Sequence, residues 1–253
     1  MRGPKVLLLD IETAPNLVWA WSVYDSNAIA VKEHWYLLSF SAKWLGGKST
    51  TLGLPDFKGY RPGGGDKLLT EAVWKLLDEA DIVIAHNGKD FDLKKLTARF
   101  IVHGLPPPSP YKIIDTKDGA KRAAAFASNK LDWLCKQLEL GKKMDHEGFP
   151  LWEACMNGDA RAWGRMKRYN RHDVVLLEQL YNRLAPWINQ PNAGAWGLGE
   201  ERCPNVACGS QNLEKRGLAR NNTRAYQRFQ CRDCGAWGRA AVGSIRTAGV
   251  VAL

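Results

Sequence analysis

From residue 5 to residue 188, short apolar runs alternate with longer amphipathic segments. Runs bounded by glycine, proline or asparagine predict strands at 5–12, 35–45, 49–55, 81–87 and 111–117. Apolar residues at helical spacing predict helices at 66–80, 90–104, 128–140 and a long one that ends before Pro186. Three strands precede the first helix and the two types alternate afterwards. This order predicts an α/β fold with a mixed sheet covered by helices on both faces.

The pattern changes after residue 188. Residues 189–199, "NQPNAGAWGLG", are typical of a linker, so we expect one domain over 1–188 and a small basic domain over 200–253. The small domain has nine lysines and arginines against four acidic residues, which is half of the net charge of +10. Such a surface attracts polyanions.

Composition is that of a folded soluble protein. Hydrophobic residues make up 45% of the 253 residues, which suffices for a core of ordinary size. No apolar run reaches 18 residues. In "MRGPKVLLLD" the apolar run is too short for a signal peptide, and an acidic residue follows it too early. We expect a cytoplasmic protein with no membrane association.

Two acidic residues follow directly on the first apolar run, "VLLLDIET". Because residues two apart on a strand face the same side, Asp10 and Glu12 present their carboxylates together. Held that close, they need a cation between them, or one of them must bind a proton. The alternative is a strand that simply ends in solvent.

A third carboxylate is expected from "IVIAHNGKDFDLKKL", where a buried strand ends in a turn and a helix begins. Open α/β sheets usually build their sites at the carboxyl ends of strands. Asp90 and Asp92 compete for the role. We assign Asp90 to stabilisation of the helix dipole and Asp92 to the site.

A fourth carboxylate interrupts an apolar stripe in "MKRYNRHDVVLLEQLYNRLAP". At helical spacing this stripe contains Met166, Tyr169, Asp173, Leu177, Leu180 and Leu184. A buried carboxylate needs a metal, a cation or a proton as its partner. Tyr169 lies one turn before Asp173 on the same face. His172 lies off the stripe and is expected to be exposed, with substrate contact as the alternative.

Four carboxylates on a strand and two helices make an oxygen-rich site. Such donors favour Mg²⁺ or Mn²⁺, and two ions together suit the hydrolysis of phosphodiesters by in-line displacement.

The motifs "LDIET", "HNGKDFD" and "YNRHD" resemble the three exonuclease motifs of the DEDD, or DnaQ-like, superfamily of 3′–5′ exonucleases, which have a ribonuclease-H-like fold. The Y-x-x-x-D spacing resembles the tyrosine subclass, which includes ribonuclease D and the proofreading domains of A- and B-family DNA polymerases. The resemblance implies that Asp10, Glu12, Asp92 and Asp173 bind two metal ions, with Asp10 bridging them. It also implies that Tyr169 orients the attacking water and that Thr13, Asn87 and Phe91 contact the substrate.

Four of the six cysteines form two pairs in the small domain: Cys203 with Cys208, and Cys231 with Cys234. Paired thiolates at this spacing are typical of one tetrahedral Zn²⁺, and the segment resembles a zinc ribbon. Cys135 and Cys155 lie in helix-like segments and are expected to be core thiols. Unligated cysteines in a flexible tail are the alternative for the two pairs.

Basic and aromatic residues are interleaved between and after the cysteine pairs. We expect Arg220, Arg224, Tyr226 and Arg228 to bind nucleic acid, because cations for phosphates and rings for bases are what single-strand binders use. A solvated basic face or a protein-docking surface is the alternative.

We therefore expect a metal-dependent 3′–5′ exonuclease that acts on single-stranded nucleic acid, with DNA preferred to RNA. The alternatives are an exoribonuclease, a structure-specific endonuclease on the same fold, and a non-catalytic nucleic-acid-binding scaffold. The sequence has no polymerase region, so a polymerase or another replication or repair protein is a candidate partner. Similar stand-alone exonucleases occur in bacteria and their phages, which suggests that origin.

Overall fold

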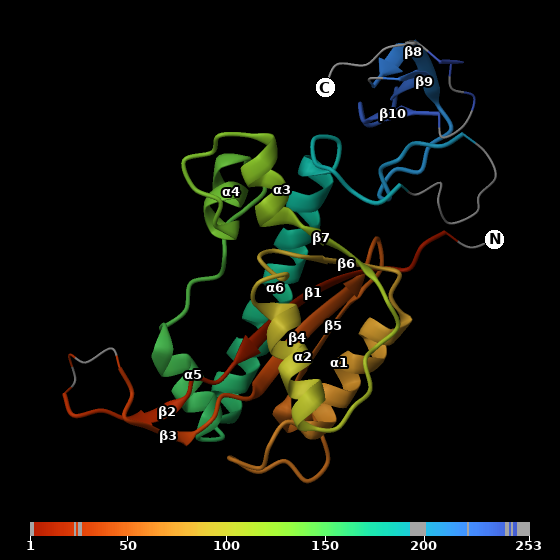
Figure 1. Ribbon diagram of the computed structural model, residues 1–253. Helices are drawn as coiled ribbons and strands as arrows, with labels where there is room; N and C mark the ends of the chain where they lie inside the picture. The colour runs from red at the N-terminus through yellow and green to blue at the C-terminus, as the bar shows by residue number, and fades with distance from the viewer. Residues whose placement is uncertain are drawn as a thin grey trace.

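A five-stranded mixed sheet forms the centre of the N-terminal part of the protein (Figure 1). The computed structural model describes residues 3–22, 24, 27–192, 201–221, 223–240, 243 and 245–246. The strands lie in the order β5-β4-β1-β6-β7. The central strand β1 is antiparallel to β4 and parallel to β6. The bounds are Val6–Thr13 for β1, Leu37–Trp44 for β4, Ser49–Gly53 for β5, Ile82–Ala85 for β6 and Lys112–Asp115 for β7.

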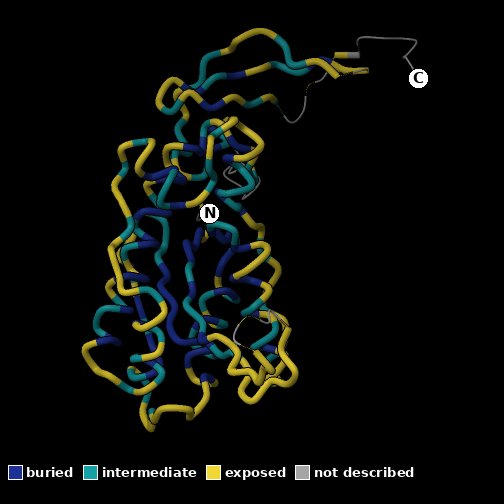
Figure 2. Tube along the Cα trace, turned by 90° about the vertical axis from the view of Figure 1, so that its left-hand side faces the viewer, coloured by how far each residue is buried: buried dark blue, intermediate teal, exposed yellow. Residues whose placement is uncertain are grey.

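Helices cover both faces of this sheet, and the alternation along β1 explains why. Leu7, Leu9 and Ile11 pack into one core with α1 and α2, whereas Val6 and Leu8 pack into a second core with α3, α4 and most of α6. Figure 2 shows these buried strands between exposed outer segments. The bounds are Lys67–Glu79 for α1, Asp92–Val102 for α2, Thr116–Ala123 for α3, Leu131–Gln137 for α4, Phe149–Met156 for α5 and Ala160–Leu184 for α6.

The mixed α/β sheet confirms the predicted fold class, with differences at element ends. The predicted strand over 111–117 ends at Asp115, because the side chain of Asp115 accepts hydrogen bonds from the backbone N–H groups of Lys117 and Asp118 and begins α3. The predicted helix over 128–140 is shorter, Leu131–Gln137, and the helix-like segment around Cys155 forms a separate helix, α5, whose bounds were not predicted. Cys135 and Cys155 are buried core thiols, as expected.

A two-stranded hairpin, β2 (Leu17–Trp19) with β3 (Ala30–Glu33), projects from the end of β1. Every residue of both strands is exposed. The sequence did not predict it as a separate unit, because strands without a buried face show no alternation of apolar and polar residues.

The C-terminal part contains a separate four-stranded sheet built around Cys203, Cys231 and Ala236. Its strands are β8 (Leu213–Arg220), β9 (Arg224–Cys231), β10 (Trp237–Arg239) and β11 (Ile245–Arg246). Most of the predicted linker, residues 193–199, lies outside the described residues. None of the helices in the described part of the chain is long and apolar enough to cross a membrane.

Candidate active site

Asp10 and Glu12 lie at the end of β1 on the sheet face that α6 covers. An amide on α6 holds the first of them: Asn170 donates from Nδ2 to Asp10 Oδ2 at 2.6 Å, and its Oδ1 accepts from Ser39 Oγ at 3.2 Å. Asn170 is fully buried. The strand and the helix therefore fix the position of Asp10 from two sides.

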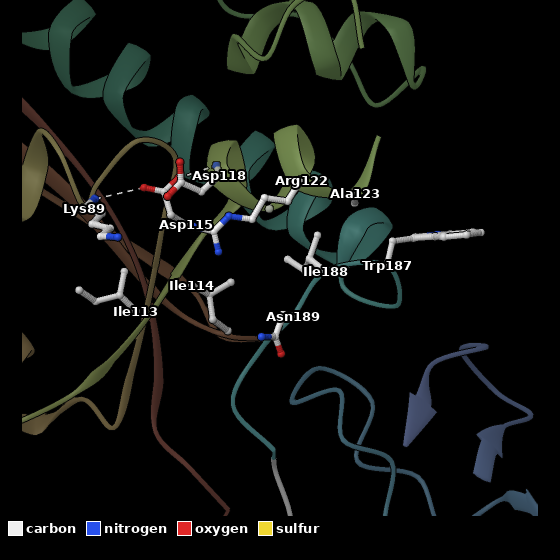
Figure 3. A pocket seen from close by; sticks show the side chains of 11 residues that line it. Lys89, Ile113, Ile114, Asp115, Asp118, Arg122, Ala123, Trp187, Ile188 and Asn189 are labelled. Atoms are coloured by element: carbon white, nitrogen blue, oxygen red, sulfur yellow. Dashed lines mark hydrogen bonds between the residues drawn. The ribbon is translucent and has the colours of Figure 1, made fainter. Parts of the chain in front are cut away.

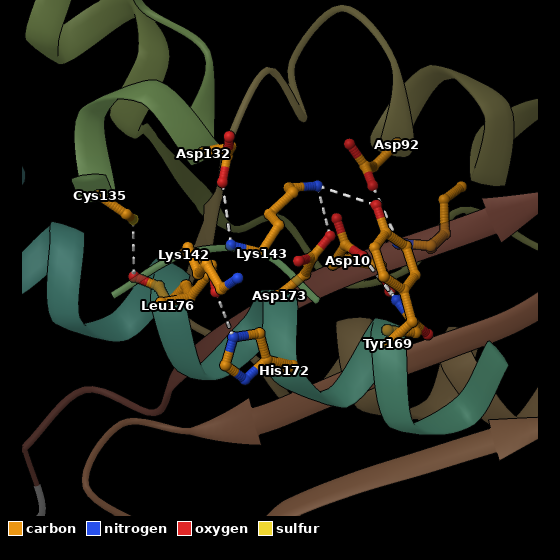
Figure 4. Close-up of polar contacts among 12 residues, drawn as sticks. Asp10, Asp92, Asp132, Cys135, Lys142, Lys143, Tyr169, His172, Asp173 and Leu176 are labelled. Atoms are coloured by element: carbon orange, nitrogen blue, oxygen red, sulfur yellow. Dashed lines mark hydrogen bonds and ion pairs between the residues drawn. The ribbon is translucent and has the colours of Figure 1, made fainter. Parts of the chain in front are cut away.

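Asp173 completes a compact group of carboxylates (Figure 4). One oxygen each from Asp10, Glu12 and Asp173 lies within 4.8 Å of the others. Asp173 is buried, and its Oδ1 has no hydrogen-bond partner in the described structure. A buried carboxylate oxygen without a partner is costly unless a cation binds it.

Asp92 lies at the start of α2, beside this group but not among the three closest carboxylates. It is buried, and its Oδ1 accepts a hydrogen bond from the backbone N–H of Ile11 at 3.1 Å. Asp90, in contrast, is exposed and pairs with Lys94 at 3.0 Å. The turn before α2 requires Gly88, because a Cβ there would lie 2.2 Å from Ala85 Cβ.

The carboxylates perturb one another strongly. Burial, followed by the charges of Asp92 and Glu12, raises the pKa of Asp10 well above 3.8. Burial and then the charge of Asp173 raise the pKa of Glu12 to about 8. Burial raises the pKa of Asp92 to about 6. The cluster without added cations therefore holds protons that a metal would displace.

Lys143, which the sequence analysis missed, places an ammonium group inside this cluster. Its Nζ lies 2.5 Å from Asp173 Oδ2 and 3.0 Å from the Tyr169 hydroxyl, and its backbone N–H donates to Asp132 Oδ1 at 2.9 Å. The residue belongs to the irregular segment between α4 and α5, where no periodic pattern could have indicated it. Asn170 was also missed, although it lies three residues before Asp173 and shares the buried stripe of α6.

Tyr169 lies beside Asp173 as the helical spacing predicted. Burial, followed by the charge of Asp173, raises the pKa of Tyr169 far above its ordinary value, so its hydroxyl stays protonated. The rings of His146 and Trp152 contact the Tyr169 ring edge-on at centroid distances of 4.8 and 6.1 Å. His172 is half-buried, not exposed as predicted, because its Nε2 bonds the carbonyl oxygen of Lys142.

Two of the three predicted substrate contacts lie together. Thr13 and Phe91 line one pocket of about 340 Å³ with Trp35, Lys95 and Trp152. The Lys95 Nζ lies 3.3 Å from Thr13 Oγ1 and 4.1 Å from the centroid of the Trp35 ring. Asn87 does not line this pocket; its Oδ1 accepts from Lys117 Nζ at 3.0 Å.

The four cysteines of the C-terminal sheet converge. Their sulfurs lie within 4.8 Å of one another, with Cys203 3.5 Å from Cys234 and Cys208 3.8 Å from Cys231. All four are free thiols. The structure thus brings together two pairs that are far apart in sequence.

The predicted basic residues lie on β8 and β9. Arg224, Tyr226 and Arg228 alternate with buried Ala225 and Phe229, so they share the outer face of β9, while Arg220 ends β8. Two guanidinium groups stack on rings of this sheet: Arg239 lies 4.1 Å from the ring centroid of Tyr226, and Arg228 lies 4.9 Å from that of Trp237.

The strand order, the carboxylates at the carboxyl end of the central strand β1, and the helices on both faces define a ribonuclease-H-like protein. A family model described as the RNase_H superfamily matches residues 58–185, half of the chain, and the chain belongs to this superfamily. The matched region includes Asp92, Tyr169 and Asp173.

A solved structure supports the same fold. The family B DNA polymerase from the hyperthermophilic archaeon Pyrobaculum calidifontis is similar over 73% of this chain, with a TM-score of 0.53 and 15% identity. The match covers 25% of the polymerase, so this chain spans about a quarter of its length. No curated protein matches the chain. Superfamily membership and the acidic cluster together support a nuclease.

Proposed function

We propose that the protein is a metal-dependent 3′–5′ exonuclease that acts on single-stranded nucleic acid, with DNA preferred to RNA. One observation carries the proposal: Asp10, Glu12 and Asp173 converge on a point where an Asp173 oxygen has no partner among the described residues, beside a protonated Tyr169 hydroxyl. The Y-x-x-x-D spacing and the fold shared with a family B DNA polymerase support the tyrosine subclass.

The donor set fits Mg²⁺ or Mn²⁺. All its donors are carboxylate oxygens. Burial first, and then the neighbouring carboxylates, raise the pKa values of Asp10 and Glu12, and bound cations would favour their charged forms. Asp10, Glu12, Asp92 and Asp173 would hold two ions. When bound, such ions make a water more acidic and offset charge on the leaving oxygen.

The remaining residues position the reacting groups. The protonated hydroxyl of Tyr169 can hydrogen-bond and orient the attacking water. The Lys143 ammonium, which pairs with Asp173, would neutralise a phosphate oxygen once metal ions are bound to Asp173. A bond forms from the water oxygen to phosphorus, and the bond from phosphorus to the 3′-oxygen of the preceding nucleotide breaks. That 3′-oxygen gains a proton, and a nucleoside 5′-monophosphate leaves.

The four cysteines fit a structural Zn²⁺. With Zn–S bonds of about 2.3 Å, a tetrahedral site places sulfurs about 3.8 Å apart. The two measured pairs, at 3.5 and 3.8 Å, already approach that geometry. We assign residues 1–188 to the nuclease domain, 189–199 to a linker and 200–253 to a zinc ribbon that binds the substrate through Arg220, Arg224, Tyr226 and Arg228.

One assay tests the catalytic proposal. Single-stranded DNA and RNA, each labelled at the 5′ end, are incubated with Mg²⁺ or Mn²⁺ and either the wild type or the Asp10→Ala variant. A descending ladder that the variant does not produce supports the exonuclease. Internal cuts would indicate an endonuclease, an unchanged oligonucleotide would indicate a binding protein, and a ladder on RNA alone would indicate an exoribonuclease.

The role of the ribbon is tested in the full-length protein. Each phosphate contact contributes about −0.7 to the slope of log affinity against log salt concentration on single strands. Arg220→Ala combined with Arg228→Ala should flatten that slope by about 1.4. An unchanged slope and affinity would indicate that the ribbon binds another partner, such as a polymerase or a repair protein.

A further inference from the structure

A second groove, of about 430 Å³, lies outside the carboxylate site, between β7, α3 and the end of α6 (Figure 3). Its floor is apolar and contains Ile114 and Ile188, both buried. The floor is well packed, because α3 closely approaches the segment that follows α6: a Cβ at Gly119 would lie 2.9 Å from Ile188 Cγ2.

An indole projects at one end of this groove. Trp187, which follows α6, is 77% exposed, and Figure 3 shows its ring standing away from the floor. Large exposed aromatic side chains at the rim of a pocket are typical of binding sites, since full solvation of an indole is unfavourable. The ring offers a flat face to a ligand with a π system.

Two cations border the groove, Lys89 at one end and Arg122 on α3. Two acidic residues, Asp115 and Asp118, also line it. The carboxylate of Asp115 accepts hydrogen bonds from four backbone N–H groups, those of Asn87, Lys89, Lys117 and Asp118, and these dipoles offset its charge. The groove therefore combines an apolar floor, a stacking face and two cations, with Asp118 as the one carboxylate in its lining that such a set of backbone dipoles does not offset.

The groove is lined by residues next to both parts of the chain that the proposed function assigns to nucleic acid, the active site and the C-terminal ribbon. Lys89 belongs to the turn that leads into Asp92, and its backbone N–H donates to Asp115 Oδ2 at 3.1 Å. At the other end, Asn189 is the first residue of the linker to the ribbon. The lining thus includes one residue of the turn before Asp92 and the residue at which the predicted linker begins.

We propose that this groove binds a nucleotide of the single-stranded substrate upstream of the scissile bond, with a base stacked on Trp187 and phosphates bound by Lys89 and Arg122. The inference rests on the proposed function, because it needs a strand whose 3′ end lies at the carboxylates. It predicts that affinity depends on substrate length: a trinucleotide occupies the carboxylate site alone, whereas a 12-nucleotide strand also reaches the groove.

The test compares Trp187→Ala, Trp187→Phe and wild type on both lengths of DNA. Removing a stacking ring lowers affinity by roughly 5- to 150-fold per base. Trp187→Ala should weaken binding of the 12-nucleotide strand by at least about 5-fold, Trp187→Phe should retain most of the affinity, and hydrolysis of the trinucleotide should be unchanged in both. Unchanged trinucleotide hydrolysis also reports that the variants are folded. Equal affinity of Trp187→Ala and wild type for the long strand would overturn the proposal.

A charge test is independent of the indole. Lys89→Ala combined with Arg122→Ala should reduce the salt slope on the 12-nucleotide strand by about 1.4, whereas Lys75→Ala, which removes an exposed lysine of α1, should not change it. An equal change in both variants would overturn the proposal.

Binding is measured without added Mg²⁺ or Mn²⁺, where a metal-dependent nuclease cannot cut, and without a chelator, so that the proposed Zn²⁺ site is left intact. The groove and the catalytic proposal can therefore fail separately. If Trp187→Ala weakens binding but the wild type hydrolyses no oligonucleotide with either metal, the exonuclease proposal is refuted and the groove proposal stands. If the wild type produces a ladder and Trp187→Ala binds as tightly as wild type, the exonuclease proposal stands and the groove proposal is refuted; the groove would then suit a protein partner.

Discussion

Replacing Glu12 with glutamine should stabilise the metal-free protein while it abolishes activity. The pKa of Glu12 is raised from 4.5 to about 8, so the folded protein binds a proton more tightly than the unfolded chain does. Between these two values, stability falls as pH rises, because the unfolded chain releases this proton first. At pH 7 the loss is about 3 kcal/mol, from 2.5 pKa units at about 1.36 kcal/mol each.

Glutamine keeps the shape of the side chain and removes this charge, so the loss should disappear. A gain of about 3 kcal/mol corresponds to a rise in melting temperature of roughly 6 to 12 °C for a chain of this size. The rise should be largest near pH 8 and vanish near pH 4.5. The matched control is Glu153→Gln, which changes an exposed glutamate of α5.

The assay is thermal unfolding without added Mg²⁺ or Mn²⁺ and without a chelator across pH 4.5 to 8.5, repeated with Mg²⁺ and Mn²⁺. With metal, wild type should gain stability as the ions displace protons, and Glu12→Gln should gain much less. If Glu12→Gln melts at or below the temperature of wild type at pH 8 without these metals, burial and repulsion do not destabilise the charged form of Glu12.

Three further changes test other parts of the site. Asn170→Ala removes the hydrogen bonds to Asp10 and Ser39, so metal affinity measured by calorimetry should fall roughly 10- to 100-fold; unchanged affinity would contradict a positioning role. Lys143→Ala should lower the single-turnover rate by about 10²-fold or more, with partial recovery in Lys143→Arg, whereas equal rates would remove Lys143 from catalysis. Removing Zn²⁺ from the proposed ribbon with a chelator should unfold it, which is measured as protease cleavage within residues 200–253, while trinucleotide hydrolysis with added Mg²⁺ persists; loss of both would show that the parts do not fold separately.

Local patterns predicted the elements that pack against the core. The continuous apolar run of β1 is typical of a strand buried on both faces, and the apolar stripe of α6 repeats with the helical period. These patterns placed Asp10, Glu12, Tyr169 and Asp173 on faces that the structure brings together. Their roles as ligands and as the water-orienting group stay predictions.

Other parts depend on tertiary contacts that no period encodes. Lys143 reaches the carboxylates from an irregular segment, held there by the hydrogen bond from its backbone to Asp132. The helix α5 is eight residues long, which is too short for a 3.6-residue apolar repeat to fix its bounds. Asn87 lies in the predicted turn but faces Lys117, because the cap at Asp115 turns α3 toward it.

The central position of β1 ties the active site to the stability of the whole domain. Because Leu7 and Leu8 are paired with strands on both sides, their amide hydrogens can exchange with solvent only when a large part of the sheet opens. Asp10 and Glu12 are continuous with that segment. Partial unfolding of the outer elements would therefore leave the two carboxylates in place, and a destabilising substitution far from the site should reduce the fraction of active molecules without changing the turnover of those that remain.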